Sequence, residues 1–277
     1  MVRPDLVGLP IYKMTGSGND FVIVDGRLSQ PGDWRPEEMK DVCARGTGVG
    51  ADGLVFVSPG QEAGAARMVY YNSDGSHAAM CGNAALCSTR LAVQLGIVRG
   101  PAFRLETDAG VYEARYPGQG ERAELHLAAV TAPADVPGLA TDDLEKRAAL
   151  AVVGVPHLVI LMDDVDQLDL MGRGKALRFD PAVGPAGANV NFISKDNGAW
   201  RMRTYERGVE AETLACGTGS VAAACALDRW GVSKLPATIY TRSGRVLEVK
   251  AKRAKDGRYD DVWLAGEARL VFRGVLA

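Results

Sequence analysis

The sequence has little of what metal centres and nucleic-acid-binding surfaces need. Its 277 residues include three histidines and five cysteines, with a net charge of −2. There is no Cys-x-x-Cys pair and no His-x-x-x-His, so the spacing of a metal site is missing. The near-neutral charge gives no basic footprint for nucleic acid. We therefore expect a protein without a metal and without a nucleic-acid partner.

Long apolar runs are also absent. No run approaches the roughly 20 residues that a membrane-spanning helix needs. The first five residues, Met1-Val2-Arg3-Pro4-Asp5, lack the apolar core of a signal peptide. The odd number of cysteines, without the density of a disulfide scaffold, indicates thiols in a reducing compartment. We expect a cytoplasmic protein with no membrane contact.

Two of the cysteines head matching segments. Cys-Gly-Asn-Ala-Ala begins at Cys81, and Cys-Gly-Thr-Gly-Ser begins at Cys216. Each is followed by an Ala-rich run, as far as Leu95 or Trp230, that predicts a buried helix. A thiol at a helix start meets unpaired backbone N–H groups and the positive end of the helix dipole, which favour the thiolate. Two such thiols on either side of one carbon would be a matched acid and base.

The other three cysteines, Cys43, Cys87 and Cys225, lie among apolar neighbours and read as buried, inert thiols. Cys81 or Cys216 alone would be read the same way. Their equivalent positions in two matching segments change that interpretation.

The chain repeats itself with an offset near 135 residues, the difference between 216 and 81. Four further blocks match in the same order, and they are 21–25 with 158–163, 51–54 with 188–191, 71–72 with 205–206, and 103–110 with 238–244. We therefore predict two similar domains, residues 1–133 with Cys81 and residues 134–277 with Cys216. A cleft between such domains is a usual place for a ligand.

Each half combines short β-rich runs, bounded by turn residues, with one long helix that has no polar stripe. We predict an α+β fold of two pseudo-symmetric domains, each a curled mixed or antiparallel sheet around a central apolar helix. A charged outer helix is expected at 35–43, with a partner at 142–147.

Three motifs carry a resemblance to a known family. The first is Gly16-Ser17-Gly18-Asn19-Asp20-Phe21. The second is the run from Asn72 to Asn83, which begins with Asn-Ser-Asp-Gly-Ser and ends with Met-Cys-Gly-Asn. The third is Tyr205-Glu206-Arg207-Gly208, followed by Cys216-Gly217-Thr218-Gly219. Over nearly its whole length the sequence resembles the diaminopimelate epimerases. The resemblance implies conversion of LL-2,6-diaminopimelate to the meso form, in lysine and peptidoglycan-precursor biosynthesis, without pyridoxal phosphate or another cofactor. The family is often dimeric, so a homodimer is the assembly it implies.

The resemblance also implies roles for individual residues. Cys81 and Cys216 would be the catalytic pair, one taking the α-proton as thiolate and the other delivering a proton to the opposite face. Backbone N–H groups at the two helix starts would stabilise the enediolate-like charge on the substrate carboxylate. The implied substrate-binding residues are Asn19, Asn72, Gly82, Asn83, His157, Asn189, Glu206, Arg207, Gly217 and Thr218. Arg207 would pair with the distal carboxylate and Glu206 with an ammonium group.

The sequence departs from the family pattern at four positions. Ala84 and Leu86 replace a Gly and an Arg found in many members, Val155 replaces an Asn, and Gly53 stands where some members have Gln. Leu cannot supply the hydrogen-bond donors of an arginine, so the start of that helix must pack differently. At Val155 one substrate hydrogen bond is lost or made by another group.

Three other functions remain open from the sequence. The nearest is a cofactor-independent racemase of another amino acid, of the histidine type, since proline-type racemases differ around their cysteines. A thiol hydrolase or transferase needs a cysteine activated by a histidine base, and no histidine occupies equivalent places in both halves. The third is a non-catalytic binding protein, against which the retained cysteines and the Glu206-Arg207 pair argue.

Overall fold

The computed structural model describes residues 3–277. The chain forms two compact units, the first of residues 3–126 with 265–277 and the second of residues 127–264. The chain passes between them twice, after His126 and after Leu264. The predicted halves, 1–133 and 134–277, differ from this division at both boundaries, because residues 127–133 belong to the second unit and residues 265–277 to the first. The last strand, β17 (Arg269–Val275), pairs antiparallel with β1 (Pro10–Gly16) and so belongs to the first unit.

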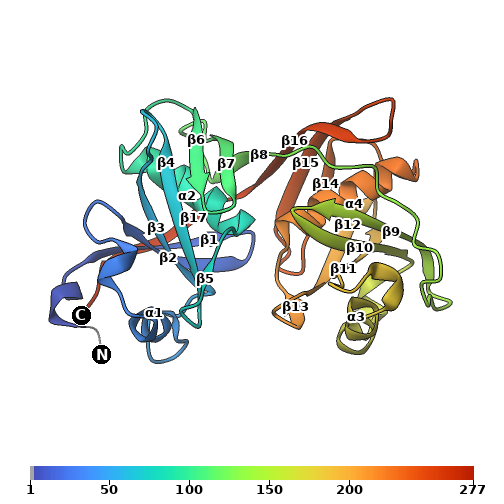
Figure 1. The fold of residues 1–277 in the computed structure, drawn as a ribbon, viewed down its shortest axis with the longest axis horizontal. Coiled ribbons are helices and arrows are strands. Elements are labelled where there is room, and N and C mark those ends of the chain that lie inside the picture. Colours follow the sequence, from blue (N-terminus) through green and yellow to red (C-terminus); the bar gives the residue numbers. More distant parts are fainter. Residues whose placement is uncertain (1–2) are drawn as a thin grey trace. The chain divides into compact units, whose positions relative to one another are not determined.

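The first unit is a mixed sheet with the strand order β17–β1–β2–β3–β4–β6–β7 (Figure 1). The pairs β2–β3 and β4–β6 are parallel and the others antiparallel, while β5 adds to β4 and β8 to β7. Its remaining elements are β2 (Asn19–Asp25), β3 (Gly53–Pro59), β4 (Ala66–Asn72), β5 (His77–Ala78), β6 (Ala102–Thr107), β7 (Gly110–Arg115), β8 (Arg122–Leu127), the helices α1 (Pro36–Cys43) and α2 (Gly82–Gln94), and the 3-10 turns Pro4–Leu6 and Pro31–Asp33.

The second unit repeats this order as β9–β10–β11–β12–β14–β15, with β10–β11 and β12–β14 parallel and with β13 added to β12. Its elements are β9 (Glu145–Val153), β10 (Val155–Met162), β11 (Asn189–Asp196), β12 (Ala199–Glu206), β13 (Ala211–Thr213), β14 (Ala237–Tyr240), β15 (Val246–Arg253), the helices α3 (Leu170–Arg178) and α4 (Gly217–Arg229), and the 3-10 turns Val165–Gln167 and Pro181–Val183. Strand β16 (Tyr259–Glu267) leads the chain out of this unit. The matching order of parallel and antiparallel pairs confirms the predicted α+β fold of two similar halves.

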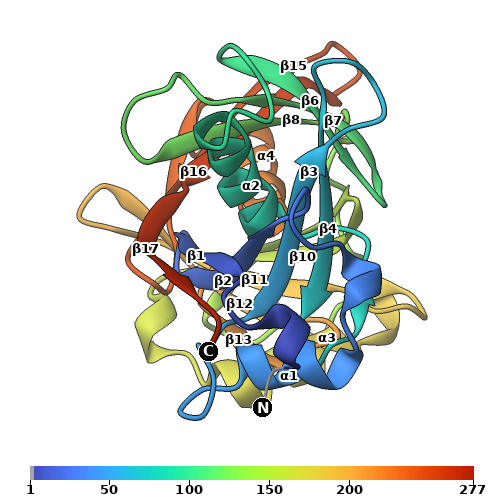
Figure 2. The ribbon, with the colours of Figure 1, turned by 90° about the vertical axis from the view of Figure 1, so that its left-hand side faces the viewer.

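Each sheet curls around one apolar helix, as predicted. In the first unit α2 packs against β1, β2, β3, β4 and β7 (Figure 2). In the second, α4 packs against β9, β10, β11, β14 and β15. Both helices have 13 residues, and both are followed by a glycine with positive φ, Gly96 (66°) and Gly231 (70°). Glycine ends a helix in this left-handed conformation without the steric cost of a side chain.

One predicted helix is wrong. The charged segment 142–147 leads into strand β9, and the outer helix of the second unit is α3. In β9 the side chains of Ala149, Ala151 and Val153 are buried at every second position. This two-residue period sets the conformation of the segment, which is too short to bury a helical face of its own. The other predicted outer helix is confirmed as α1.

Two departures from the family pattern are explained by packing. Leu86 is fully buried in α2, so it fills core space in place of the arginine's donors. Gly53 begins β3 opposite Asn72, and a Cβ there would overlap the Tyr70 ring and lie 2.5 Å from the Tyr71 carbonyl oxygen. A larger residue at 53 would therefore force the neighbouring strand to move. Between residues 3 and 277, no helix is long and apolar enough to cross a membrane.

Candidate active site

Cys81 lies at the N-cap of α2, as the sequence predicts. Its backbone is extended, with φ −140° and ψ 119°, and the helix begins at Gly82. The N–H groups of Gly82 and Asn83 belong to the first turn, which has no intrahelical acceptors. These amides and the half-buried thiol thus lie at the positive end of a buried helix.

Cys216 occupies the same place on α4, with φ −128° and ψ 110°. Its Sγ accepts a hydrogen bond from the Gly219 N–H at 3.4 Å and lies 3.7 Å from the Thr218 Oγ1. Hydrogen bonds to sulfur favour the charged thiolate over the thiol. One backbone N–H group of the first turn of α4 thus points at this sulfur.

In the first unit, polar contacts join the predicted residues Asn19 and Asn83. Asn83 Nδ2 donates to Asn19 Oδ1 at 2.7 Å, and Asn19 Nδ2 donates to Asp52 Oδ2 at 3.0 Å. Arg45 donates to the other oxygen of Asp52 at 2.8 Å. A carboxylate only accepts hydrogen bonds, so Asp52 fixes which way the Asn19 amide faces. Within residues 3–277, Asn83 Oδ1 is buried and has no hydrogen-bond partner, which leaves an open acceptor in the first turn of α2.

Asn72 ends β4 at the same edge of the sheet as Asn19, because Gly53 pairs with both Phe21 and Asn72. Its side chain donates to Ser76 Oγ at 3.0 Å within the following turn. The structure thus places Asn72 near the end of the strand that carries Asn19, with its amide used in local turn geometry.

In the second unit three predicted residues gather at the starts of β10 and β11. His157 of β10 pairs with Asn189 of the parallel strand β11. Asn189 Oδ1 accepts a hydrogen bond from the Arg207 N–H at 2.7 Å. Burial, and then the positive charge of Arg207, lower the pKa of His157 to about 3. The imidazole of His157 is therefore neutral at physiological pH.

Asn191 links these residues to Cys216, and sequence reasoning missed it. It is fully buried in β11 and contacts His157 Nδ1 through its Nδ2 at 3.2 Å. A Cβ on Gly219 would overlap Asn191 Oδ1 and lie 3.1 Å from Cys216 Sγ, so the amide packs on the first turn of α4. The available signal was an asparagine within the apolar run Val190-Asn191-Phe192-Ile193, since a buried amide requires polar partners.

Glu206 ends β12 opposite Ala211 of β13. Burial raises the pKa of its carboxyl group, and the Thr213 hydroxyl offsets this in part. A partly desolvated carboxylate binds a cation more strongly than an exposed one. Glu206 is therefore suited to receive an ammonium group.

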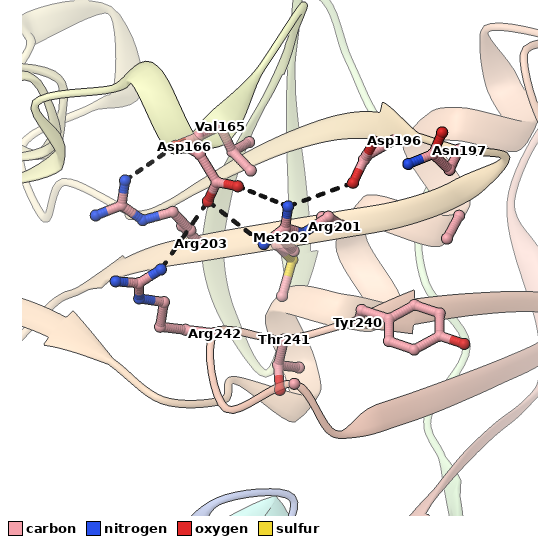
Figure 3. A pocket seen from close by; sticks show the side chains of 12 residues that line it. Val165, Asp166, Asp196, Asn197, Arg201, Met202, Arg203, Tyr240, Thr241 and Arg242 are labelled. Carbon is pink, nitrogen blue, oxygen red and sulfur yellow. Dashed lines mark hydrogen bonds and ion pairs between the residues drawn. The ribbon is translucent and has the colours of Figure 1, made fainter.

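A separate pocket of about 270 Å³ lies in the second unit (Figure 3). Arg201 and Arg203 line it, on the face of β12 opposite to Thr204 by strand alternation. Arg201 donates to Asp166 at 2.6 Å, and Arg203 donates to Glu212 at 2.7 Å. None of the predicted site residues lines this pocket, and its arginines are paired with carboxylates of the same unit.

No group of three or more His, Cys, Asp or Glu residues that could hold a metal ion occurs in the part of the chain that the structure describes.

Replacing Gly219 by Ala is expected to destabilise the protein by about 1–3 kcal/mol, the usual cost of overpacking a core. The new methyl group would displace the Asn191 amide and press on the Cys216 sulfur. The urea midpoint of unfolding measures the loss. Gly32→Ala is the control, because a Cβ there meets nothing within 4 Å. Equal stability of the two variants would contradict this account of the α4 start.

Solved structures of other proteins share the fold. A phenazine biosynthesis protein of the PhzF family from Bacillus anthracis aligns with a TM-score of 0.73 at 15% identity, over 97% of this chain and 99% of that one. A hydroxyproline epimerase from Agrobacterium vitis aligns with a TM-score of 0.69 at 19% identity, over 100% of this chain and 94% of that one. At these identities the likeness is one of fold.

Sequence comparisons are more specific. The family model for diaminopimelate epimerase matches residues 11–131 and 149–271. The chain is 48% identical to a diaminopimelate epimerase from Gemmatimonas aurantiaca, over 97% of this chain and 99% of the relative. It is 38% identical to the enzyme of the same name from Aquifex aeolicus, over 97% and 98%. Matches of this extent and identity, on the two-cysteine fold described above, show that the chain belongs to the diaminopimelate epimerase family.

Proposed function

We propose that this protein epimerises LL-2,6-diaminopimelate to the meso form by a two-thiol mechanism, with Cys81 and Cys216 as acid and base. One observation carries the proposal: each unit presents a cysteine at the N-cap of an equivalent 13-residue helix. The mechanism requires the two sulfurs to face one Cα from opposite sides. One sulfur, as thiolate, removes the α-proton, and the other, as thiol, returns a proton to the opposite face.

The α-proton of an amino acid is a very weak acid, so the negative charge formed on its removal must be stabilised. Backbone N–H groups at Gly82, Asn83, Gly217 and Thr218 are suitable donors to the substrate carboxylate as it becomes enediolate-like. Fixed donors of this kind are typically worth about a hundred- to a thousandfold in rate each. No cofactor is needed to take up the charge in this scheme.

The remaining polar residues would recognise the substrate. In the proposal Arg207 pairs with the distal carboxylate and Glu206 receives an ammonium group. Asn19, Asn72 and Asn189 supply further hydrogen bonds, and the raised pKa of the buried Glu206 carboxyl fits a group that awaits a positive partner. This set suits a substrate with charges at both ends.

A thiol hydrolase fits less well. Such an enzyme needs a histidine that can take the thiol proton. Burial and the Arg207 charge lower the pKa of His157 to about 3, which makes its imidazole a very weak base. The other two histidines, His77 and His126, have no counterpart beside Cys216 in the repeat.

The test is isotope exchange in deuterated water. Purified protein is incubated with LL-diaminopimelate, histidine or proline, and deuterium at Cα is measured by mass spectrometry. We expect label to enter diaminopimelate and the meso form to accumulate. Label in histidine alone would replace the proposed substrate, and no label in any amino acid would favour a binding protein.

Two further expectations accompany the proposal. Both thiols must stay unpaired for acid–base chemistry, and all five cysteines are free, which supports a reducing, cytoplasmic location. The homodimer implied by the family resemblance stays a prediction that sedimentation analysis can test.

A further inference from the structure

Asn191 lies in β11 of the second unit, beside His157 and the start of α4, and has no exposed surface. Its Nδ2 lies 3.2 Å from His157 Nδ1, 3.3 Å from the Leu158 carbonyl oxygen and 3.4 Å from the Asn189 carbonyl oxygen. Its Oδ1 accepts a hydrogen bond from Thr204 Oγ1 at 3.1 Å. All of these partners lie on β10, β11 and β12 of the second unit.

The surroundings of Asn191 determine which way its amide faces. The two backbone carbonyls can only accept hydrogen bonds, so the end of the amide beside them must be the NH₂ group. The reverse orientation would place Oδ1 against two carbonyl oxygens, neither of which can donate a hydrogen bond to it. The NH₂ group therefore also faces His157, and Nδ1 of that imidazole must be the acceptor.

It follows that the single proton of the neutral imidazole is on Nε2. Burial and the charge of Arg207 lower the pKa of His157 to about 3, so Nδ1 stays free to accept from Asn191 at neutral pH. Nε2 is buried and has no hydrogen-bond partner within residues 3–277. A buried N–H without a partner costs free energy, which an acceptor on a bound ligand would recover.

We propose that Asn191 is a positioning residue that holds His157 in the Nε2–H tautomer, and that this N–H donates to an anionic oxygen of the bound substrate. The inference rests on the proposed function for the identity of that substrate. An anionic oxygen is favoured because the positive charge of Arg207 acts on the same imidazole. In this role His157 gives a hydrogen bond and takes no proton from either thiol.

The tautomer can be read directly by nuclear magnetic resonance, because the chain has only three histidines. Long-range ¹H–¹⁵N spectra of protein labelled in its histidines distinguish a protonated ring nitrogen from a bare one. His157→Gln identifies the His157 signals. We expect a bare Nδ1 and a protonated Nε2 that do not change between pH 5 and 8. A protonated Nδ1 in the unmodified protein would overturn the assignment.

Asn191→Asp tests the cause, because a carboxylate of the same shape accepts where the amide donates. We expect the proton to move to Nδ1 and kcat/KM for diaminopimelate to fall about ten- to a hundredfold, because Nε2 no longer donates. Thr204→Val is the matched control, since it removes the partner of Oδ1 and leaves the contact with His157 Nδ1 in place. It should lower stability without moving the proton.

The outcomes separate this inference from the proposed function. An unchanged tautomer in a folded Asn191→Asp variant would overturn the role of Asn191, whatever the activity. A shifted tautomer with unaltered kcat/KM would overturn the role of His157 as a donor to the substrate. The expected tautomers together with no exchange at diaminopimelate would refute the proposed function and leave the Asn191–His157 assignment supported.

Discussion

Replacing Cys81 by Ser is expected to lower kcat for diaminopimelate epimerisation by at least about a thousandfold. A serine hydroxyl is a far weaker acid than a thiol, so at neutral pH it can supply neither the base for one face nor a matched acid for the other. Cys216→Ser should have an effect of similar size, because the two groups act in one proton relay. The measurement is the rate of meso-diaminopimelate formation from the LL isomer.

Residues that act as a unit are not additive in their effects. The double variant should therefore be little slower than either single variant. Cys225→Ala is the control, because burial raises the pKa of Cys225 to about 12 and keeps it an inert thiol in the core. It should lose stability and retain kcat. A Cys81→Ser variant that keeps most of the activity would refute the two-thiol mechanism and favour a single nucleophile at Cys216.

The repeat and its two central helices could be predicted because their signals are local. Cysteine followed by glycine and an Ala-rich run occurs twice at equal spacing, and both runs fold into buried helices with cysteine at the N-cap. The pairing of β17 with β1 joins the two ends of the chain, and no local pattern indicates such a contact. The helix predicted at 142–147 was wrong because the charged residues there give no sign of the alternating burial that follows in β9.

The site was predictable where residue type alone implies chemistry. Thiols at helix starts and the Glu206-Arg207 pair could be named from their neighbours in the chain. Asp52 and Asn191 could not, because each acts through a residue distant in sequence: Asp52 orients Asn19, and Asn191 contacts His157. Their roles depend on strand register, which brings β3 beside β2 and β11 beside β10.

Lowering the pH from 6.5 to 5 is expected to destabilise the protein by about 2 kcal/mol through His157 alone. The pKa of His157 is about 3 in the folded protein, against 6.5 for an unperturbed histidine. Below pH 6.5, His157 therefore binds a proton in the unfolded chain but not in the folded protein. Stability is lost as the pH falls through this window, at up to about 1.4 kcal/mol per pH unit, and the loss ends near pH 3.

Between pH 6.5 and pH 5, the carboxyl group that changes the free energy of unfolding is one with a raised pKa. Asp20, Asp25 and Glu38 have pKa values below the ordinary ones of 3.8 to 4.5, so their contributions to stability are lost only at lower pH, outside the window. Glu206 has a raised pKa, because burial disfavours its charge, and so makes the folded protein more stable as the pH falls. The contribution of Glu206 to stability therefore opposes that of His157, so Glu206 has to be replaced in both of the proteins that are compared.

Two proteins are compared by urea unfolding at pH 6.5 and pH 5. One carries Glu206→Gln alone, and the other carries Glu206→Gln together with His157→Gln. The difference between them isolates the contribution of His157 to the pH dependence of stability. The protein that keeps His157 should lose about 2 kcal/mol more on acidification than the protein that lacks it. Parallel losses in both proteins would mean that His157 accepts a proton in the folded state. Its Nδ1 would then be unable to receive the Asn191 amide, and the neutral imidazole on which the site depends would be excluded.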